Sequence, residues 1–111
     1  MWTNRETKAL VEHLTVPVYA EVARLVKHTV DDLNGKPELW DDYHRLAIRS
    51  LSITLRAYVE GIFEDFYFGE ERPKHVARLC HDVGSLWRVD WAQAAELLFV
   101  EHGHTKLEPP V

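Results

Sequence analysis

The sequence predicts an all-α fold: a compact bundle of four to five helices with one long central helix. Three observations support this fold class. Apolar residues recur every three or four positions, no segment shows the sustained alternation of a strand, and prolines and glycines divide the chain into helix-length segments. The chain has 111 residues, of which 46% are hydrophobic, and this suits one domain with its own core. We expect a helical domain over residues 1–103 and a flexible tail over residues 104–111.

The first helix is predicted to begin near Asn4. Thr3 and Glu6 have the spacing of a capping box, in which two side chains satisfy amides at the start of a helix. Pro17 interrupts the pattern, because proline lacks an amide donor and disfavours helical geometry in the residue before it. In a first turn, however, proline costs little. We therefore predict two helices that meet at a corner at Thr15–Val16.

The second helix is predicted to start at Pro17 and to end at Asn34-Gly35, where Gly35 suits a left-handed cap. Tyr19 falls in its first turn, where the ring can pack while the hydroxyl reaches solvent. The apolar stripe of this helix consists of Val18, Val22, Leu25, Val26, Val30 and Leu33.

Residues 38–68, which follow Pro37, form the longest uninterrupted segment. Apolar residues cover much of its circumference, and this indicates a helix that is buried on more than one side. We expect it to be the centre of the bundle, the interface of a homodimer, or both. Gly61 is the candidate position for a bend or a break. The main apolar stripe consists of Trp40, Tyr43, Ala47, Leu51, Tyr58, Ile62 and Phe66.

Two shorter helices are predicted after the boundary marked by Gly69 and Pro73. Asp90 and Gln93 have a spacing that suits the cap of the final helix, and Gly103 is expected to end it. The preceding helix, with Gly84 near its end, has an apolar stripe of Val76, Leu79, Cys80, Val83, Leu86 and Trp87.

Two acidic blocks, residues 31–42 and 60–71, are candidate binding surfaces for a basic protein partner. The net charge is −5, and acidic blocks alternate with basic ones, so no uniform nucleic-acid footprint is predicted. Complementary charge chiefly speeds encounter and sets specificity. The candidate carboxylates are Asp31, Asp32, Asp41, Asp42, Glu60, Glu64, Asp65, Glu70 and Glu71. The candidate aromatic anchors are Trp2, Trp40, Tyr67 and Phe68.

A small basic cluster is the candidate for contact with nucleic acid, because arginines interleaved with aromatics can bind single strands by charge and stacking. In a net-acidic chain four such charges predict little, so direct nucleic-acid binding is not expected. The alternative is pairing with the acidic block just before the cluster. The cluster consists of Arg72, Lys74, Arg78 and Arg88.

No catalytic constellation is visible in the sequence. Cys80 and His81 are neighbours on a predicted helix and point about 100° apart, so they cannot form a dyad, and Cys80 is interpreted as a buried, inert thiol. None of the seven histidines has a known metal-ligand spacing. We expect no enzyme activity, no metal and no cofactor. The single cysteine and the absence of a signal peptide or membrane-length apolar run predict a soluble, cytoplasmic protein.

Two segments carry a resemblance to small proteins of mobile elements. In "LTVPVYAEVARLV", Val16, Pro17 and Tyr19 match a turn that opens a helix in phage- and plasmid-encoded antirestriction proteins. The segment "VDWAQAAELLFVEHG" is similar to the closing helix of many small phage proteins. The resemblance implies steric inhibition, in which carboxylates on a helical surface occupy the DNA-binding groove of a nuclease. The mixed charge of this chain favours a mixed interface of the anti-CRISPR type.

A third segment, "AIRSLSITLRAYVEGIFEDF", resembles the long helix of HEPN-type domains. That resemblance implies a dimeric helical module of a toxin–antitoxin or defence system. Its nucleases carry an Arg, four to six residues, then a His. Here only two residues separate Arg72 from His75 and Arg78 from His81, so nuclease activity is not expected.

The sequence therefore favours a non-enzymatic protein-interaction protein, with a phage or mobile-element inhibitor of a host defence nuclease complex as the specific hypothesis. The alternatives are a HEPN-like dimeric module, which would form a homodimer through residues 38–68, and a structural subunit of a larger assembly.

Overall fold

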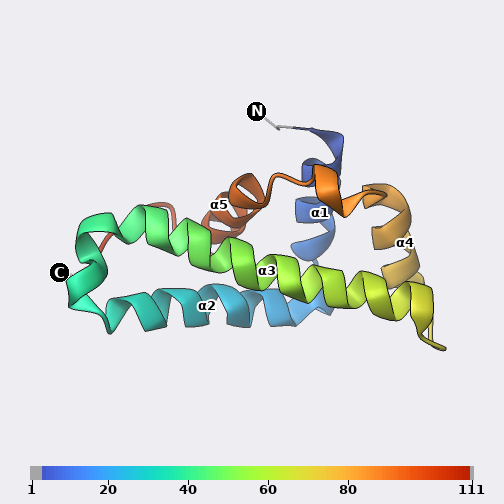
Figure 1. The fold of residues 1–111 in the computed structure, drawn as a ribbon, viewed down its shortest axis with the longest axis horizontal. Coiled ribbons are helices and arrows are strands. Elements are labelled where there is room, and N and C mark those ends of the chain that lie inside the picture. Colours follow the sequence, from blue (N-terminus) through green and yellow to red (C-terminus); the bar gives the residue numbers. More distant parts are fainter. Residues whose placement is uncertain (1–3, 111) are drawn as a thin grey trace.

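A computed structural model of the chain describes residues 4–110. Over these residues the chain is helical, without a strand, and α3 packs against α2, α4 and α5 (Figure 1). This confirms the predicted all-α bundle with one long central helix. The helices are α1 (Arg5–Leu14), α2 (Ala20–Asn34), α3 (Tyr43–Phe68), α4 (Lys74–Val83) and α5 (Trp91–Glu101). Three short 3-10 helices link them: η1 (Pro17–Tyr19), η2 (Pro37–Asp42) and η3 (Leu86–Arg88).

Helix α1 begins where the sequence predicts, but a different residue caps it. Asn4 is the N-cap, and its side-chain oxygen accepts a hydrogen bond from the Thr7 N–H at 2.8 Å. The Thr7 hydroxyl in turn accepts a hydrogen bond from the Asp90 N–H at 2.9 Å. The cap therefore also ties the start of α1 to the start of α5. The predicted cap residue, Thr3, lies outside the described residues.

The predicted corner at Thr15–Val16 is confirmed, with Pro17 as the first residue of η1. Because residues 17–19 form a 3-10 turn, the apolar stripe of α2 does not extend back to Val18, which is 53% exposed. Tyr19 is buried instead, and its hydroxyl donates to the His75 carbonyl at 3.3 Å. The expectation that this hydroxyl reaches solvent is therefore wrong. Burial, more than the nearby Tyr58 and Cys80, raises the pKa of Tyr19 to about 12.

The junction between α2 and α3 differs in detail from the prediction. Helix α2 ends at Asn34 as expected, but Gly35 has a φ of −83° and so does not form a left-handed cap. The predicted long helix starts as the 3-10 turn η2 and becomes α-helical at Tyr43. It then continues through Gly61 without interruption to Phe68. Among the described helices none is long and apolar enough to cross a membrane.

The core lies between α3 and helices α2, α4 and α5, and α1 adds to it by packing against α4 and α5. The inner side of α3 contributes Leu51, Leu55 and Val59, all fully buried. Leu107, in the segment expected to be a flexible tail, is also buried against the core. The tail is therefore attached to the bundle at this residue. The largest fully buried side chain is that of Phe99 in α5.

The turn after α4 redirects the chain. Gly84 has a φ of +75°, a conformation that favours glycine. The residues after Gly84 therefore no longer follow the spacing of α4. Trp87, which the sequence places on the apolar stripe of that helix, lies on η3 instead, with 83% of its surface exposed. The predicted cap of α5 is confirmed, since the Gln93 N–H donates to the Asp90 carboxylate at 3.0 Å.

Asp82 in α4 connects two helices. The guanidinium of Arg5 donates to the Asp82 carbonyl at 2.7 Å, and His13 Nε2 lies 2.7 Å from the Asp82 carboxylate. His81 Nδ1 approaches the same carboxylate at 3.4 Å. Hydrogen bonds from His13 and, less strongly, His81 lower the pKa of Asp82 below its ordinary value of 3.8.

This contact predicts a pH-dependent contribution to stability. A depressed carboxyl pKa stabilises the fold above the ordinary value, and this contribution is lost as the pH falls through the folded-state pKa. We expect Asp82→Asn to lower the melting temperature slightly at neutral pH and to make no difference well below pH 3.8. Thermal melts followed by circular dichroism at both pH values test this. Glu96→Gln, at an exposed position in α5, is the control; a gap for Asp82→Asn that stays constant with pH would contradict the assignment.

Candidate protein-interaction site

The end of α3 makes a tight turn that only glycine fits. The Gly69 N–H donates to the Asp65 carbonyl at 2.8 Å. A Cβ at Gly69 would lie 2.4 Å from that same oxygen, far inside contact distance. The chain then runs without helical structure to Pro73, which precedes α4.

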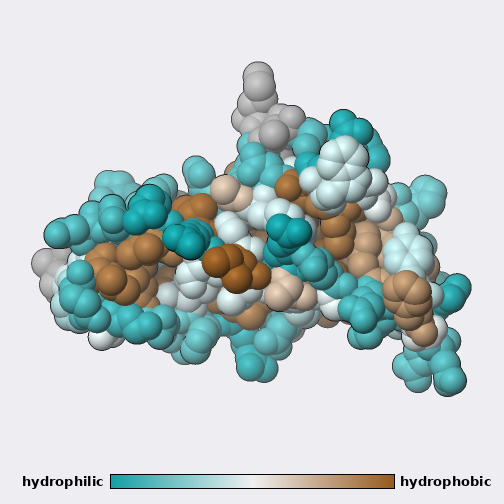
Figure 2. Space-filling view, viewed as in Figure 1, coloured by the Kyte–Doolittle hydropathy of each residue, from teal (hydrophilic) through white to brown (hydrophobic). Residues whose placement is uncertain are grey.

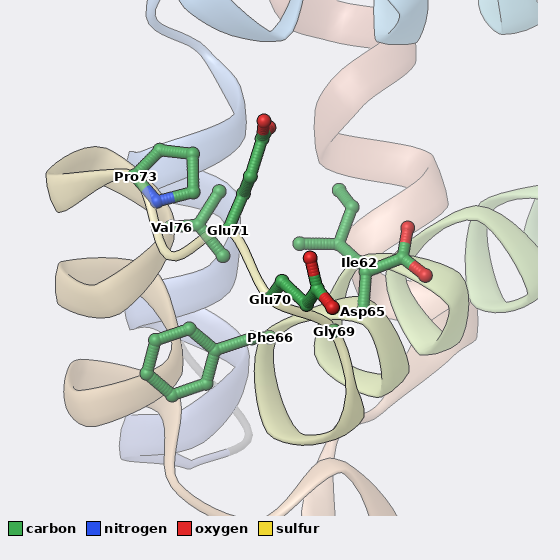
Figure 3. Close-up of a pocket in the computed structure, with 8 residues that line it drawn as sticks. All are labelled: Ile62, Asp65, Phe66, Gly69, Glu70, Glu71, Pro73 and Val76. Carbon is green, nitrogen blue, oxygen red and sulfur yellow. The ribbon is translucent and has the colours of Figure 1, made fainter.

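This turn leaves a cavity of about 570 Å³ between the end of α3 and the start of α4. Figure 3 shows the side chains around it: Ile62, Asp65 and Phe66 come from α3, and Val76 comes from α4. Glu70 and Glu71 come from the linker. We call this region the acidic corner; its apolar surface comes from Ile62, Phe66 and Val76, and its charge from Asp65, Glu70 and Glu71.

The carboxylates of the acidic corner have no ion-pair partner among the residues that the structure describes. Within residues 4–110, Asp65, Glu70 and Glu71 form no ion pair, and neither does the nearby Glu64. Arg72 follows them directly but lies over the Phe66 ring, 5.6 Å from its centroid. The corner therefore presents three carboxylates without an ion pair beside an apolar surface, with Arg72 next to it on Phe66.

The remaining candidate carboxylates are mostly paired. Asp31 lies 3.6 Å from Lys27 and Asp32 lies 3.1 Å from Lys36. Asp42 is paired with Arg45 at 2.9 Å, and Glu60 with Arg56 at 2.5 Å. In the described part of the chain, Asp41 alone of the block 31–42 candidates has no ion pair.

The structure does not bring the two acidic blocks together. Helix α3 has 26 residues and is therefore about 39 Å long. Residues 31–42 lie at its start and residues 64–71 at its end (Figure 1). Of the two predicted acidic surfaces, the acidic corner thus has more carboxylates without an ion pair in the described part of the chain.

The aromatic candidates divide in the same way. Phe68 and Tyr67, at the end of α3, are 86% and 54% exposed. Trp40 is half-buried, and its indole N–H donates to the Leu33 carbonyl at 3.0 Å. Trp40 is therefore a packing residue of the α2–η2 junction rather than an exposed anchor. Trp2 lies outside the described residues.

The basic candidates do not form one patch of free charge. Arg72 stacks on Phe66, whereas Arg88 stacks on Trp87 and lies 3.8 Å from Glu6. Lys74 and Arg78 are exposed, one turn apart on α4. As far as the described residues go, none of the four forms an ion pair with the acidic block 60–71, so the alternative of pairing with that block is wrong; Arg88 lies near Glu6 instead.

The groups capable of chemistry are dispersed. Cys80 is 2% exposed, and burial raises the pKa of its thiol, which confirms the prediction of a buried thiol. His75 packs edge-on against the buried Tyr19 ring, with 5.6 Å between centroids. Across residues 4–110, no three His, Cys, Asp or Glu side chains are arranged to hold a metal ion.

Six large exposed apolar side chains of the described residues were not among the candidates. The two with the largest exposure are Ile53 on α3 and Trp87 on η3, at 60% and 83%; the others are Val16, Val18, Leu39 and Val100. Ile53 falls outside the main apolar stripe in the sequence, and this was the available indication. For Trp87 the indication was the glycine at position 84, because a glycine that ends a helix also ends the spacing from which the apolar stripe was inferred.

Comparison of the sequence with family models and curated proteins, and of the structure with solved structures, gives no match.

Proposed function

We propose that this protein is a non-enzymatic interaction protein whose acidic corner binds a basic surface of another protein. The observation that carries the proposal is the combination of Asp65, Glu70 and Glu71, which form no ion pair in the described part of the chain, around a cavity that Ile62, Phe66 and Val76 line in part. Such a surface supplies both long-range attraction and a place for an anchoring side chain. An Arg or Lys of the partner, with its apolar stem and charged head, suits both parts of the cavity.

The partner class that this chemistry favours is a protein with a nucleic-acid-binding groove, since such grooves carry arrays of Lys and Arg for phosphate contact. A helical protein that presents carboxylates to such a groove would exclude nucleic acid by occupying it. We therefore propose a mobile-element inhibitor of a host defence nuclease complex as the specific function. The small helical fold and the free charge at one end of α3 support this proposal.

The test is affinity capture from an extract of cells that contain such a defence complex, with mass spectrometry of the retained proteins. The wild-type chain is expected to retain a nuclease or nucleic-acid-binding protein. The variant Asp65→Lys/Glu70→Lys/Glu71→Lys is expected to lose it, because like charges would then face each other across the interface. All three positions are exposed, so the variant should fold.

The matched control is Glu38→Lys/Asp41→Lys/Glu101→Lys, which changes the net charge by the same amount at exposed positions away from the acidic corner. It is expected to retain the partner. Equal retention by the two triple variants, or no retention by the wild-type chain, would contradict the proposal.

A further inference from the structure

A second surface of α3 is distinct from the acidic corner. It consists of the exposed Arg49, Ile53, Glu60, Glu64 and Phe68 and the half-buried Leu46, and we call it the outer face. At 100° per residue, these six residues lie within about 60° of Ile53 around the helix, whereas Ile62 of the acidic corner lies about 180° away. Ile53 is 60% and Phe68 is 86% exposed. Figure 2 shows hydrophobic side chains at the surface on the side of the molecule where α3 lies in front.

The outer face is divided by charge along its length. From residue 43 to 59 the chain carries three arginines and no acidic residue, and from residue 60 to 71 it carries five acidic residues and no basic one. Arg49 and Glu64 are members of the outer face that form no ion pair in the described part of the chain. A helix with this polarity repels a parallel copy of itself and attracts an antiparallel one.

The spacing of the side chains agrees with an antiparallel register. In a two-fold dimer each residue meets its counterpart at the same distance from the axis. With the axis between Arg56 and Ala57, Arg49 and Glu64 are equally far from it, about 11 Å in opposite directions. Leu46 and Phe68 are both about 16–17 Å from it. One register therefore places the free charges opposite each other and the apolar ends of the face at similar distances from the axis, with Ile53 opposite Glu60, each about 5 Å from the axis.

A cavity that can hold the Phe68 ring of a second copy lies at the other end of the outer face. This cavity of about 270 Å³ lies between α2 and α3. Its apolar lining residues are Leu33, Leu39, Leu46 and Ile53, and its polar ones are Thr29, Asp32, Arg49 and Ser50. An apolar cavity of about 150 Å³ suffices for benzene, so this one accommodates a phenyl ring. In the antiparallel register, Phe68 of one copy lies above this cavity in the other.

We propose that a second copy of this chain docks antiparallel on the outer face of α3. Arg49 of each copy then faces Glu64 of the other, and each Phe68 enters the cavity beside Leu46 and Ile53. The interface uses the side of α3 opposite Ile62, so both acidic corners of the dimer stay open.

The arrangement is tested by exchanging the charges at positions 49 and 64 and measuring dimerisation by analytical ultracentrifugation over a range of protein concentrations. The wild-type chain is expected to dimerise reversibly. Arg49→Glu and Glu64→Arg alone are each expected to weaken the dimer by about tenfold or more, because like charges then meet at two symmetric places. The double variant Arg49→Glu/Glu64→Arg is expected to restore it. Arg78→Glu on α4 is the control and should leave the dimer unchanged.

A wild-type chain that stays monomeric, or a double variant as weak as the single ones, would overturn the proposal. Because all the changed side chains are exposed, circular dichroism should show intact helices in every variant. This result can be distinguished from a failure of the proposed function. If a monomeric Arg49→Glu chain still captures a basic partner, the acidic corner binds the partner without the dimer. If the chain dimerises but captures no partner, the proposal for the outer face holds and the proposed function does not.

Discussion

Replacement of Phe99 by alanine is expected to lower the free energy of unfolding by about 3–5 kcal/mol. The Phe99 ring is fully buried in α5 and meets the His104 ring edge-on, with 6.1 Å between centroids. Truncation would leave a cavity among the helices that the backbone cannot close. For a domain whose total stability is about 5–15 kcal/mol, this is a large fraction. Urea unfolding followed by circular dichroism measures it.

Val100→Ala is the matched control, since Val100 is the next residue in α5 but is 45% exposed. We expect its effect to stay within about 0.5 kcal/mol. If Phe99→Ala does not fold, Phe99→Leu should fold with a smaller loss, because it leaves a smaller cavity. Equal losses at positions 99 and 100 would contradict the placement of α5.

Replacement of Gly69 by alanine is expected to cost about 1–3 kcal/mol, the usual range for overpacking. The added methyl group would lie 2.4 Å from the Asp65 carbonyl oxygen, so the last turn of α3 has to open. Hydrogen exchange should then show faster exchange of the residue 69 amide, which donates to that carbonyl. Because the same turn forms the acidic corner, partner binding should weaken as well.

Gly35→Ala is the control for this experiment. Its added methyl group would meet the Asp32 carbonyl oxygen at 3.5 Å, an ordinary contact, with a φ of −83°. We expect this substitution to be neutral or to stabilise the fold by about 0.4–1 kcal/mol, because alanine lowers the conformational entropy of the unfolded chain. A loss of stability at Gly35 as large as at Gly69 would mean that the contact at Gly69 is not the cause.

Much of the fold could be predicted because local chemistry marks the ends of its helices. Pro17 follows the corner between α1 and η1, Asn34 ends α2 and Asp90 caps α5, as the sequence indicates, although α2 begins at Ala20 rather than at Pro17. The errors arise where a 3-10 turn changes the helical phase. Val18 and Trp87 both follow the apolar spacing of a neighbouring α-helix, yet both lie on 3-10 turns and are exposed.

The candidate site could be predicted only in part. Asp31 and Glu60 each have a basic residue four positions away, and spacing of this kind on a helix predicts their ion pairs. Asp65 has no basic residue within four positions, so the absence of a local ion pair at Asp65 could also be predicted from the sequence. The cavity could not be predicted from the sequence, because it depends on how α4 packs against the end of α3.

The most direct test of the central claim, that the acidic corner is the docking surface, is cross-linking from defined positions. A photo-reactive amino acid at position 71 lies in the acidic corner, whereas one at position 101 lies at the end of α5. We predict that irradiation of the chain with its captured partner gives a cross-link from position 71 and none from position 101. A cross-link from position 101 without one from position 71 would contradict the claim.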